Sequence, residues 1–273
     1  MAYSNVRTLV VPTATGGQEI RRIATLGAVS MDVSAYEDYP AGSRIDPIAV
    51  TGDSQLVSAA PAPTSTVFAV DALGNLEAGM TVEVAGNDAR IQAIAGTELT
   101  LVDALAAAPA VGDPVTPYAS LSTDAGSGSL VLSLSNRQGL AVGSTIRIGQ
   151  NPDEEHVTIA RIVGERTVTP DAGTLVVSAP LGQDHAGGTR VLHMAAPTVD
   201  GSRPPVWTVL AAGAGDTDLY VNDDANFAVG DIVSITTAAG GVHYHRLVAD
   251  AVTAEMAMVG VDAALGFSHE AGA

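Results

Sequence analysis

The sequence contains one pattern three times, and this repetition constrains the fold more than any other feature. Each copy begins with a run of β-forming residues, followed by an apolar residue, a glycine three residues later and then a strand-like alternation. These first halves are Thr66-Val-Phe-Ala-Val70 with Leu76 and Gly79, Ser129-Leu-Val-Leu-Ser-Leu134 with Leu140 and Gly143, and Asp218-Leu-Tyr-Val221 with Phe227 and Gly230. Because short apolar and polar alternation is typical of half-buried strands, each copy is predicted to be a small antiparallel β unit.

The second half of each copy has a strand, a leucine and a glycine seven residues after that leucine. These halves are Glu98-Leu-Thr-Leu-Val102 with Leu105 and Gly112, Thr174-Leu-Val-Val177 with Leu181 and Gly188, and Met256-Ala-Met-Val259 with Leu265 and Gly272. A further strand is expected between the halves, at 89–94, 156–162 and 243–248. The one helical signal covers Glu19 to Leu26. The predicted fold class is therefore all-β, with three related tandem antiparallel modules.

The repeat also predicts the domain organisation. An N-terminal arm or small β domain is expected at 1–57, repeat 1 at 66–118, repeat 2 at 129–194 and repeat 3 at 207–273. Segments rich in small and turn-forming residues, at 58–65, 121–128 and 197–205, are interpreted as linkers.

The third copy lacks the strand that follows the last glycine in the other two, because only Ala273 follows Gly272. An open sheet edge promotes unwanted pairing. We hypothesise that this edge is completed by another chain or by the N-terminal arm. The alternative is that the final strand is dispensable.

Composition excludes several function classes. The 273 residues contain no cysteine and no lysine, so disulfides, thiolate metal sites, Schiff bases and phosphate-binding P-loops are not expected. The formal net charge of -18 argues against direct binding to nucleic acid, because phosphate contacts need clustered cations. The start carries no secretory signal pattern, and no apolar run reaches the ~20 residues that a membrane-spanning helix needs. No cofactor is expected.

Two patterns in the sequence bear on catalytic or metal chemistry. Gly52-Asp53-Ser54 resembles the nucleophile block of GDSL-type esterases, with Asp153 to His156 as the Asp-x-x-His pair. That family requires helices, so a hydrolase built on Ser54 ranks last, and 153–155 is interpreted as a solvated hairpin tip. His243 and His245 project from one face of a strand and are weak metal candidates without a third ligand. His185 and His269 are interpreted as a recurring turn feature.

The candidate interface residues come from the arm and the third repeat. Arg21 and Arg22 form the only adjacent basic pair, and Trp207 is the only tryptophan. The full set of interface candidates is Arg21, Arg22, Val10, Val11, Trp207 and Ala273.

The module, a β run, Leu/Phe-x-x-Gly, two strands and Leu followed by Gly seven residues later, resembles β-rich repeats of structural proteins from tailed bacteriophage virions. The resemblance covers 66–273. It implies a non-enzymatic protein that decorates or cements the capsid, located in virions assembled in the host cytoplasm. The implied partners are other virion proteins, first the major capsid protein, together with copies of the same chain, with a trimer favoured.

Other functions remain open at this point. A tail, baseplate or connector protein belongs to the same class. A host-surface carbohydrate-binding module is the main alternative from another class, although one Trp, six Tyr and three Phe give few platforms for sugar rings. A bacterial surface-layer or adhesin repeat would need a secretion signal.

Overall fold

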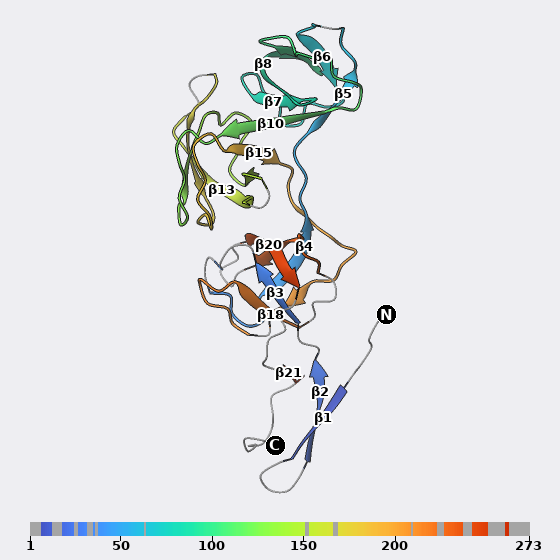
Figure 1. Ribbon diagram of the computed structural model, residues 1–273, viewed down its shortest axis with the longest axis vertical. Coiled ribbons are helices and arrows are strands. Elements are labelled where there is room, and N and C mark those ends of the chain that lie inside the picture. The colour runs from blue at the N-terminus through green and yellow to red at the C-terminus, as the bar shows by residue number, and fades with distance from the viewer. Residues whose placement is uncertain are drawn as a thin grey trace. The chain divides into compact units, whose positions relative to one another are not determined.

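The computed structural model describes residues 7–12, 18–24, 27–31, 35, 38–62, 64–150, 153–165, 169–208, 210–222, 227–236, 242–250 and 260–261. This part of the chain forms strands and no helix, which confirms the all-β prediction (Figure 1). Two compact units divide the chain. Unit 1 combines Met1–Pro47 with Asp200–Val242 and Arg246–Ala273, and unit 2 comprises Ile48–Val199 with His243–His245.

Within these ranges, no helix is long and apolar enough to cross a membrane.

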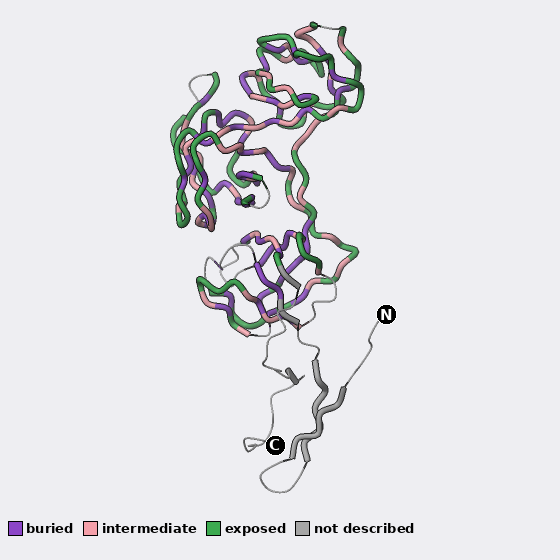
Figure 2. Tube along the Cα trace, in the orientation of Figure 1, coloured by how far each residue is buried: buried purple, intermediate pink, exposed green. Residues whose placement is uncertain are grey.

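The first repeat, together with β5 from the predicted arm and linker before it, forms a closed six-stranded barrel, called barrel 1. Its strands are β5 (Gln55–Ala59), β6 (Val67–Val70), β7 (Thr81–Val84), β8 (Asn87–Ala95), β9 (Glu98–Leu101) and β10 (Pro114–Ser120). The strand order is β10-β5-β6-β9-β8-β7, and β7 pairs back with β10. Buried residues alternate with more exposed ones along β6, β7, β9 and β10, as the period-two pattern predicted (Figure 2).

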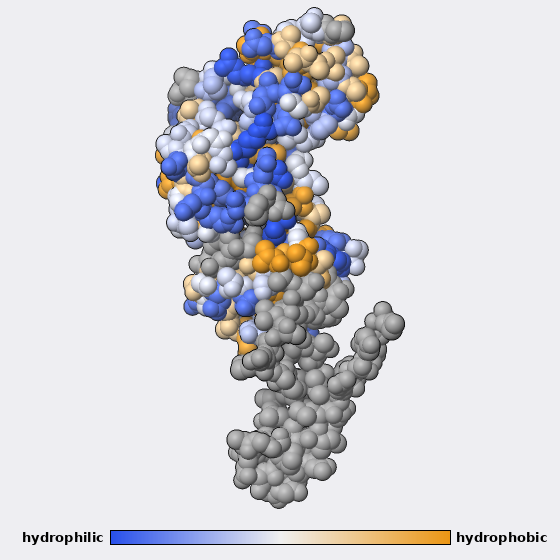
Figure 3. Space-filling view, in the orientation of Figure 1, coloured by the Kyte–Doolittle hydropathy of each residue, from blue (hydrophilic) through white to orange (hydrophobic). Residues whose placement is uncertain are grey.

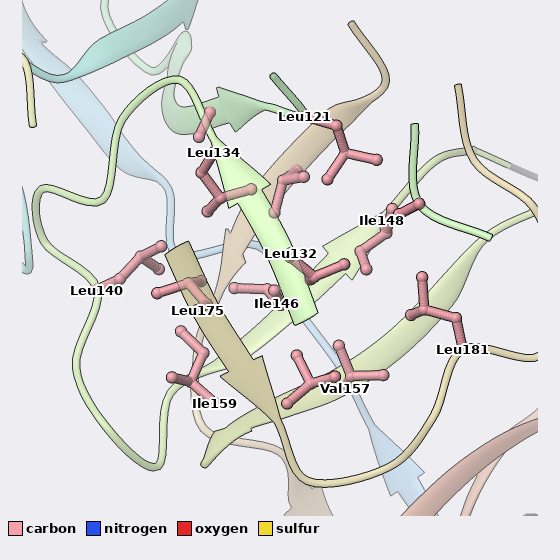
Figure 4. Close-up of a cluster of buried hydrophobic side chains, with 14 residues drawn as sticks. Leu121, Leu132, Leu134, Leu140, Ile146, Ile148, Val157, Ile159, Leu175 and Leu181 are labelled. Carbon is pink, nitrogen blue, oxygen red and sulfur yellow. The ribbon is translucent and has the colours of Figure 1, made fainter. Parts of the chain in front are cut away.

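The second repeat forms barrel 2 in the same way. It uses β10 again, with β11 (Val131–Leu134), β12 (Thr145–Ile148), β13 (Glu155–Val163), β14 (Gly173–Val177) and β15 (Arg190–Met194). The order is β11-β14-β13-β12-β15-β10, and a bridge between Leu121 and Leu134 closes the barrel. Leucine, isoleucine and valine side chains fill its interior (Figure 4).

Strand β10 belongs to both barrels. Its first part pairs with β5 and β7, whereas Tyr118 to Ser120 pair with β15. The segment 121–128, predicted to be a linker, continues β10 into the wall of barrel 2. Leu121 and Ala125 are buried there, and Ala125 forms a bridge with His185. Repeats 1 and 2 are therefore joined by a shared strand and not by a flexible connection.

A third barrel, called barrel 3, is built mostly from residues of unit 1 and draws on both ends of the described chain. Its strands are β3 (Gly27–Met31), β4 (Arg44–Ala49), β17 (Val206–Trp207), β18 (Asp218–Val221), β19 (Ile232–Thr236) and β20 (Val242–Asp250). The sheet order is β16-β4-β19-β20-β3-β18, where β16 is Thr198–Val199. β17 pairs with β4, and a bridge from Thr208 to Val221 links β17 to β18.

All three barrels have the same strand positions. We letter the six strand positions of a barrel a to f, in the order in which they follow one another along the chain in barrels 1 and 2. These positions are β5 to β10 in barrel 1 and β10 to β15 in barrel 2. In barrel 3, positions a to d are β17, β18, β19 and β20, whereas e and f are β3 and β4. The N-terminal segment therefore covers the edge that the third repeat leaves open. This agrees with the hypothesis that the N-terminal arm completes that edge. The predicted domain boundary at residue 57 did not reveal that β3 and β4 belong to the barrel of the third repeat.

The spacing of residues in the N-terminal segment supports the equivalence. In barrel 1, strand e ends at Leu101, a buried Leu105 follows four residues later, and Gly112 lies seven residues further on. Met31, Ala35 and Gly42 repeat this spacing, with alanine in place of leucine. Because the sequence pattern required leucine at this position, it did not identify the N-terminal segment as part of a repeat.

The glycine before strand f has the same geometry in each barrel. Gly42, Gly112 and Gly188 have φ of 87°, 90° and 88°, a region that glycine adopts readily and other residues rarely adopt. Their amides donate hydrogen bonds to the carbonyls of position a, with N···O distances of 2.7, 2.8 and 2.8 Å to Thr208, Val57 and Leu121, respectively. This bond ties the start of strand f to strand a.

A small separate sheet contains β1 (Arg7–Pro12), β2 (Gln18–Ala24) and β21 (Gly260–Val261). The expectation of a helix at Glu19 to Leu26 is wrong, because Gln18–Ala24 forms a strand. Its backbone pairs with β1 along the whole strand, from Arg7 opposite Ile23 to Pro12 opposite Gln18. This tertiary pairing overrides a weak local helical preference.

We expect Ile45→Ala to destabilise barrel 3, although Ile45 lies more than 150 residues from most of that barrel's strands in sequence. Ile45 is fully buried opposite Val206, and truncating such a side chain costs about 2–5 kcal/mol. Urea unfolding followed by the fluorescence of Trp207, which is in β17, measures the change. The control is Val115→Ala at the equivalent position of barrel 1. An unchanged Trp207 transition in Ile45→Ala would contradict closure of barrel 3 by β4.

Candidate functional site

Ser54, the proposed nucleophile, lies in a hydrogen-bonded structural setting. Its hydroxyl is 2.8 Å from the hydroxyl of Thr116. The neighbouring Asp53 carboxylate accepts a hydrogen bond from the Asn75 side chain at 2.7 Å. His156, the proposed base, lies in β13 of barrel 2 opposite Arg147. The structure therefore does not bring these residues together as an esterase triad requires.

A buried acid–histidine pair lies in barrel 2. His185 Nε2 is 2.9 Å from Glu155 Oε1, and the two side chains are 3% and 2% exposed. Glu155 also accepts hydrogen bonds from the backbone amides of Gly182 and Gln183 at 2.7 and 2.8 Å. The prediction of a solvated tip at 153–155 is wrong for Glu154 and Glu155, which are both buried. Glu155 holds the turn between strands e and f from inside.

A pocket of about 370 Å³ opens beside this pair. It is lined by Gly149, Gln150, Asp153, Asp184, His185, Ala186, Thr189 and Arg190. The lining combines acidic, basic and neutral polar groups but includes no cysteine or serine. Where side chains are described, no group of three His, Cys, Asp or Glu residues could hold a metal ion. The pocket has the character of a small polar recess.

Arg190 connects barrel 2 to barrel 1 at the edge of this pocket. Its guanidinium forms ion pairs with Glu83 and, at 2.7 Å, with Asp88. It also lies 4.3 Å from the centre of the Tyr118 ring on the shared strand. Burial, followed by a hydrogen bond to Asp88, raises the pKa of Tyr118 to about 12. The tyrosine therefore remains neutral at physiological pH and serves as a stacking surface for the arginine.

A second polar contact joins the two barrels within unit 2. The side chains of Asn136 and Gln138 donate hydrogen bonds to the carbonyls of Gly79 and Ala78, at 2.8 and 2.7 Å. Between them, Arg137 forms a buried two-point ion pair with Asp171, at 3.0 and 3.1 Å. Such a pair has strict geometry and holds the loop in one conformation. Sequence analysis missed this loop because its residues are far apart along the chain.

The two metal candidates, His243 and His245, are buried side chains in β20. By strand position they are equivalent to Glu155 and Val157 of barrel 2, which also face inward. The prediction that both project from one face agrees with this placement.

The predicted interface residues have different outcomes. Arg21 and Arg22 lie in β2 opposite Leu9 and Thr8, and Val10 and Val11 lie in β1, but their side chains are outside the described part. Ala273 is outside it altogether. Trp207 is 43% exposed in β17.

Leu56 is a further exposed residue that the sequence analysis did not single out. It is 44% exposed and occupies in barrel 1 the position of Trp207 in barrel 3, since Leu56 pairs with Pro114 as Trp207 pairs with Arg44. In barrel 2 the same position is Ser120, which pairs with Arg190. An alignment of the segments that precede strand b in the three repeats could have shown that Leu56, Ser120 and Trp207 are equivalent.

Comparison of the chain with known protein families, with curated proteins and with solved structures finds no match.

We expect the stability of the protein to fall as pH drops from 6.5 towards 4, because of His156. Burial, with a smaller contribution from Arg147, lowers the pKa of this imidazole from 6.5 to about 4 in the folded state. Between these values the unfolded chain binds a proton that the folded chain does not, so lowering the pH favours unfolding. The loss is on the order of 3 kcal/mol.

The test compares urea unfolding at pH 7.5 and 4.5 for the wild type and His156→Gln, followed by circular dichroism. The variant should lose less stability on acidification than the wild type. Nuclear magnetic resonance titration of the imidazole gives the pKa directly, and a value near 6.5 would contradict the expectation.

Proposed function

We propose that this protein is a non-enzymatic structural protein of a bacteriophage virion that decorates the capsid and stabilises the head. The observation that carries the proposal is one six-stranded barrel built three times from the same framework. The equivalent turns carry Pro109, His185 and Tyr39, so the framework recurs without a shared chemical group. Repetition of shape with variable side chains suits a protein whose role is to present surfaces.

The junction between barrels 1 and 2 also supports this proposal. A shared strand, the Arg190 cluster and the loop around Arg137 hold the two barrels together. Two barrels fixed in this way present their surfaces in a set geometry, which lowers the ordering cost of binding to a lattice.

The surface supports binding to other proteins. On the face that Figure 3 shows, hydrophilic areas are interspersed with apolar patches. Exposed apolar residues include Trp207 and Leu56, and tryptophan is the residue type most enriched where binding energy concentrates. The net charge of -18 keeps the free chain soluble before assembly.

Immunogold electron microscopy tests the proposal directly. Antibodies against the purified chain are applied to phage particles isolated from cells that produce it. Gold over the heads is the expected result. Gold restricted to tails or baseplates would favour the tail alternative, and unlabelled particles combined with binding on a glycan array would favour a carbohydrate-binding module. Light scattering of the purified chain tests the expected trimer, for which the mass is three times that of the chain.

We expect Trp207→Ser to weaken co-sedimentation with particles that lack the protein by roughly 30-fold, the effect of losing a side chain worth about 2 kcal/mol. The matched control is Val142→Ser, which removes another exposed apolar side chain from a turn in barrel 2. Because more than half of the Trp207 side chain is buried, its removal also costs some stability, so circular dichroism must show that the variant is folded under the binding conditions. Equal binding by the wild type and Trp207→Ser would remove Trp207 from the interface.

A further inference from the structure

The contact that joins barrels 1 and 2 uses a defined position of strand f. Arg190 lies two residues after Gly188, and its side chain is on the outer face of the barrel because the next residue, Val191, is buried. From there its two terminal nitrogens form ion pairs with Glu83 and Asp88 of barrel 1. In this chain, the outward position two residues after the glycine that precedes strand f therefore binds carboxylates of a neighbouring barrel.

Barrel 3 has an arginine at the equivalent position. Arg44 lies two residues after Gly42 and, like Arg190, precedes a buried residue, so its side chain is also on the outer face. That side chain is 52% exposed. The residue opposite Arg44 on strand a is Trp207, at the position that Ser120 has in barrel 2. An exposed arginine and an exposed tryptophan are therefore cross-strand neighbours where barrel 3 closes.

Arg44 is oriented by its own strand and keeps one terminal nitrogen for a partner. The buried Asp46 accepts hydrogen bonds from Arg44 Nε and Nη2, at 3.0 and 2.7 Å. Neither bond uses Nη1. Fixing the guanidinium in this way lowers the ordering cost of binding a further group. The Nη1 donors are then suited to a second carboxylate, just as Arg190 uses both of its terminal nitrogens.

A matching acidic pair occurs once in the described strands of this chain. Glu83 and Asp88 lie opposite each other on strands c and d of barrel 1, where Arg190 binds them. The equivalent positions of the other two barrels carry no carboxylate, and they are Arg147, His156, Ser234 and Tyr244. A second copy of the chain therefore has no vacant pair of this kind for Arg44. The partner with matching chemistry is a different protein.

We propose that Arg44 and Trp207 form a docking site on barrel 3 for a different protein that presents a carboxylate beside an apolar surface. The carboxylate accepts hydrogen bonds from Arg44 Nη1, and the apolar surface covers the Trp207 ring. Arginine and tryptophan are the residue types in which binding energy concentrates at protein interfaces. The inference rests on the proposed function, because it specifies the chemistry of the virion surface to which the chain binds.

The absence of lysine makes the partner carboxylate directly detectable. A carbodiimide couples a primary amine to a carboxylate in contact with it, and the wild-type chain has no side-chain amine. Arg44→Lys introduces a single one at the site. Arg190→Lys is the positive control, because its amine must couple to Glu83 or Asp88 within the chain. Arg161→Lys, at an exposed position of β13, is the negative control.

Each chain is mixed with particles that lack the protein, treated with carbodiimide, sedimented and digested for peptide mass spectrometry. We expect Arg44→Lys to give a peptide joined to an aspartate or glutamate of a particle protein, and Arg161→Lys to give none. Arg44→Gln, which removes the charge, should weaken co-sedimentation roughly tenfold, the effect of losing a charge-assisted hydrogen bond, whereas Arg161→Gln should not. Circular dichroism checks that each variant is folded.

The wild-type chain separates failure of this site from failure of the virion assignment. If the wild type does not co-sediment with the particles, the proposed function fails and the docking site fails with it. If the wild type binds and Arg44→Gln binds equally well, the docking site alone is overturned. The same holds if Arg44→Lys binds the particles but couples only to Asp46 or to another copy of the chain.

Discussion

The closure of strand f against strand a is the interaction on which each barrel depends. A six-stranded sheet that does not close leaves two rows of unpaired backbone groups at its edges. In this chain, a glycine with φ near +90° places its amide on the carbonyl of strand a immediately before strand f begins. A residue with a Cβ rarely adopts that backbone region. Closure of each barrel therefore requires glycine at this position, which is Gly42, Gly112 or Gly188.

Closure also explains the order of the elements along the chain. β10 can close barrel 1 and open barrel 2 because a strand has two edges and two ends, which meet different neighbours at Val115 and at Ala119. Barrel 3 meets the same requirement with strands from both sides of an insertion, since residues 50–205 separate β4 from β17. A barrel needs its strands in the right positions, and the chain order that supplies them is free to vary.

The alternation of inward residues, as in Phe68 and Val70, predicted β6 to β9 and β11 to β14, whereas β5 fell in the predicted arm and linker. It did not predict the role of 27–49. Ala35 occupies the position that leucine has in the other two barrels. Alanine is common throughout this sequence, so it marks the repeat less clearly than leucine does. The buried state of Glu155 was also unpredictable from a charged run, because its partners His185 and Gly182 lie about 30 residues away. Polar pairs between distant segments leave no periodic signal.

The same comparison separates framework from function. The first inward position of strand f keeps its apolar character in all three barrels, where it is Val115, Val191 and Ile45. Outward and turn positions change type, from Leu56 to Ser120 to Trp207, without altering the pairing around them. Variation at outward positions that leaves the strand pairing unchanged is what the proposed surface-binding role requires. The polar clusters at Arg190 and Arg137 hold the two barrels of unit 2 together, and so fix the spacing of the surfaces that these barrels present.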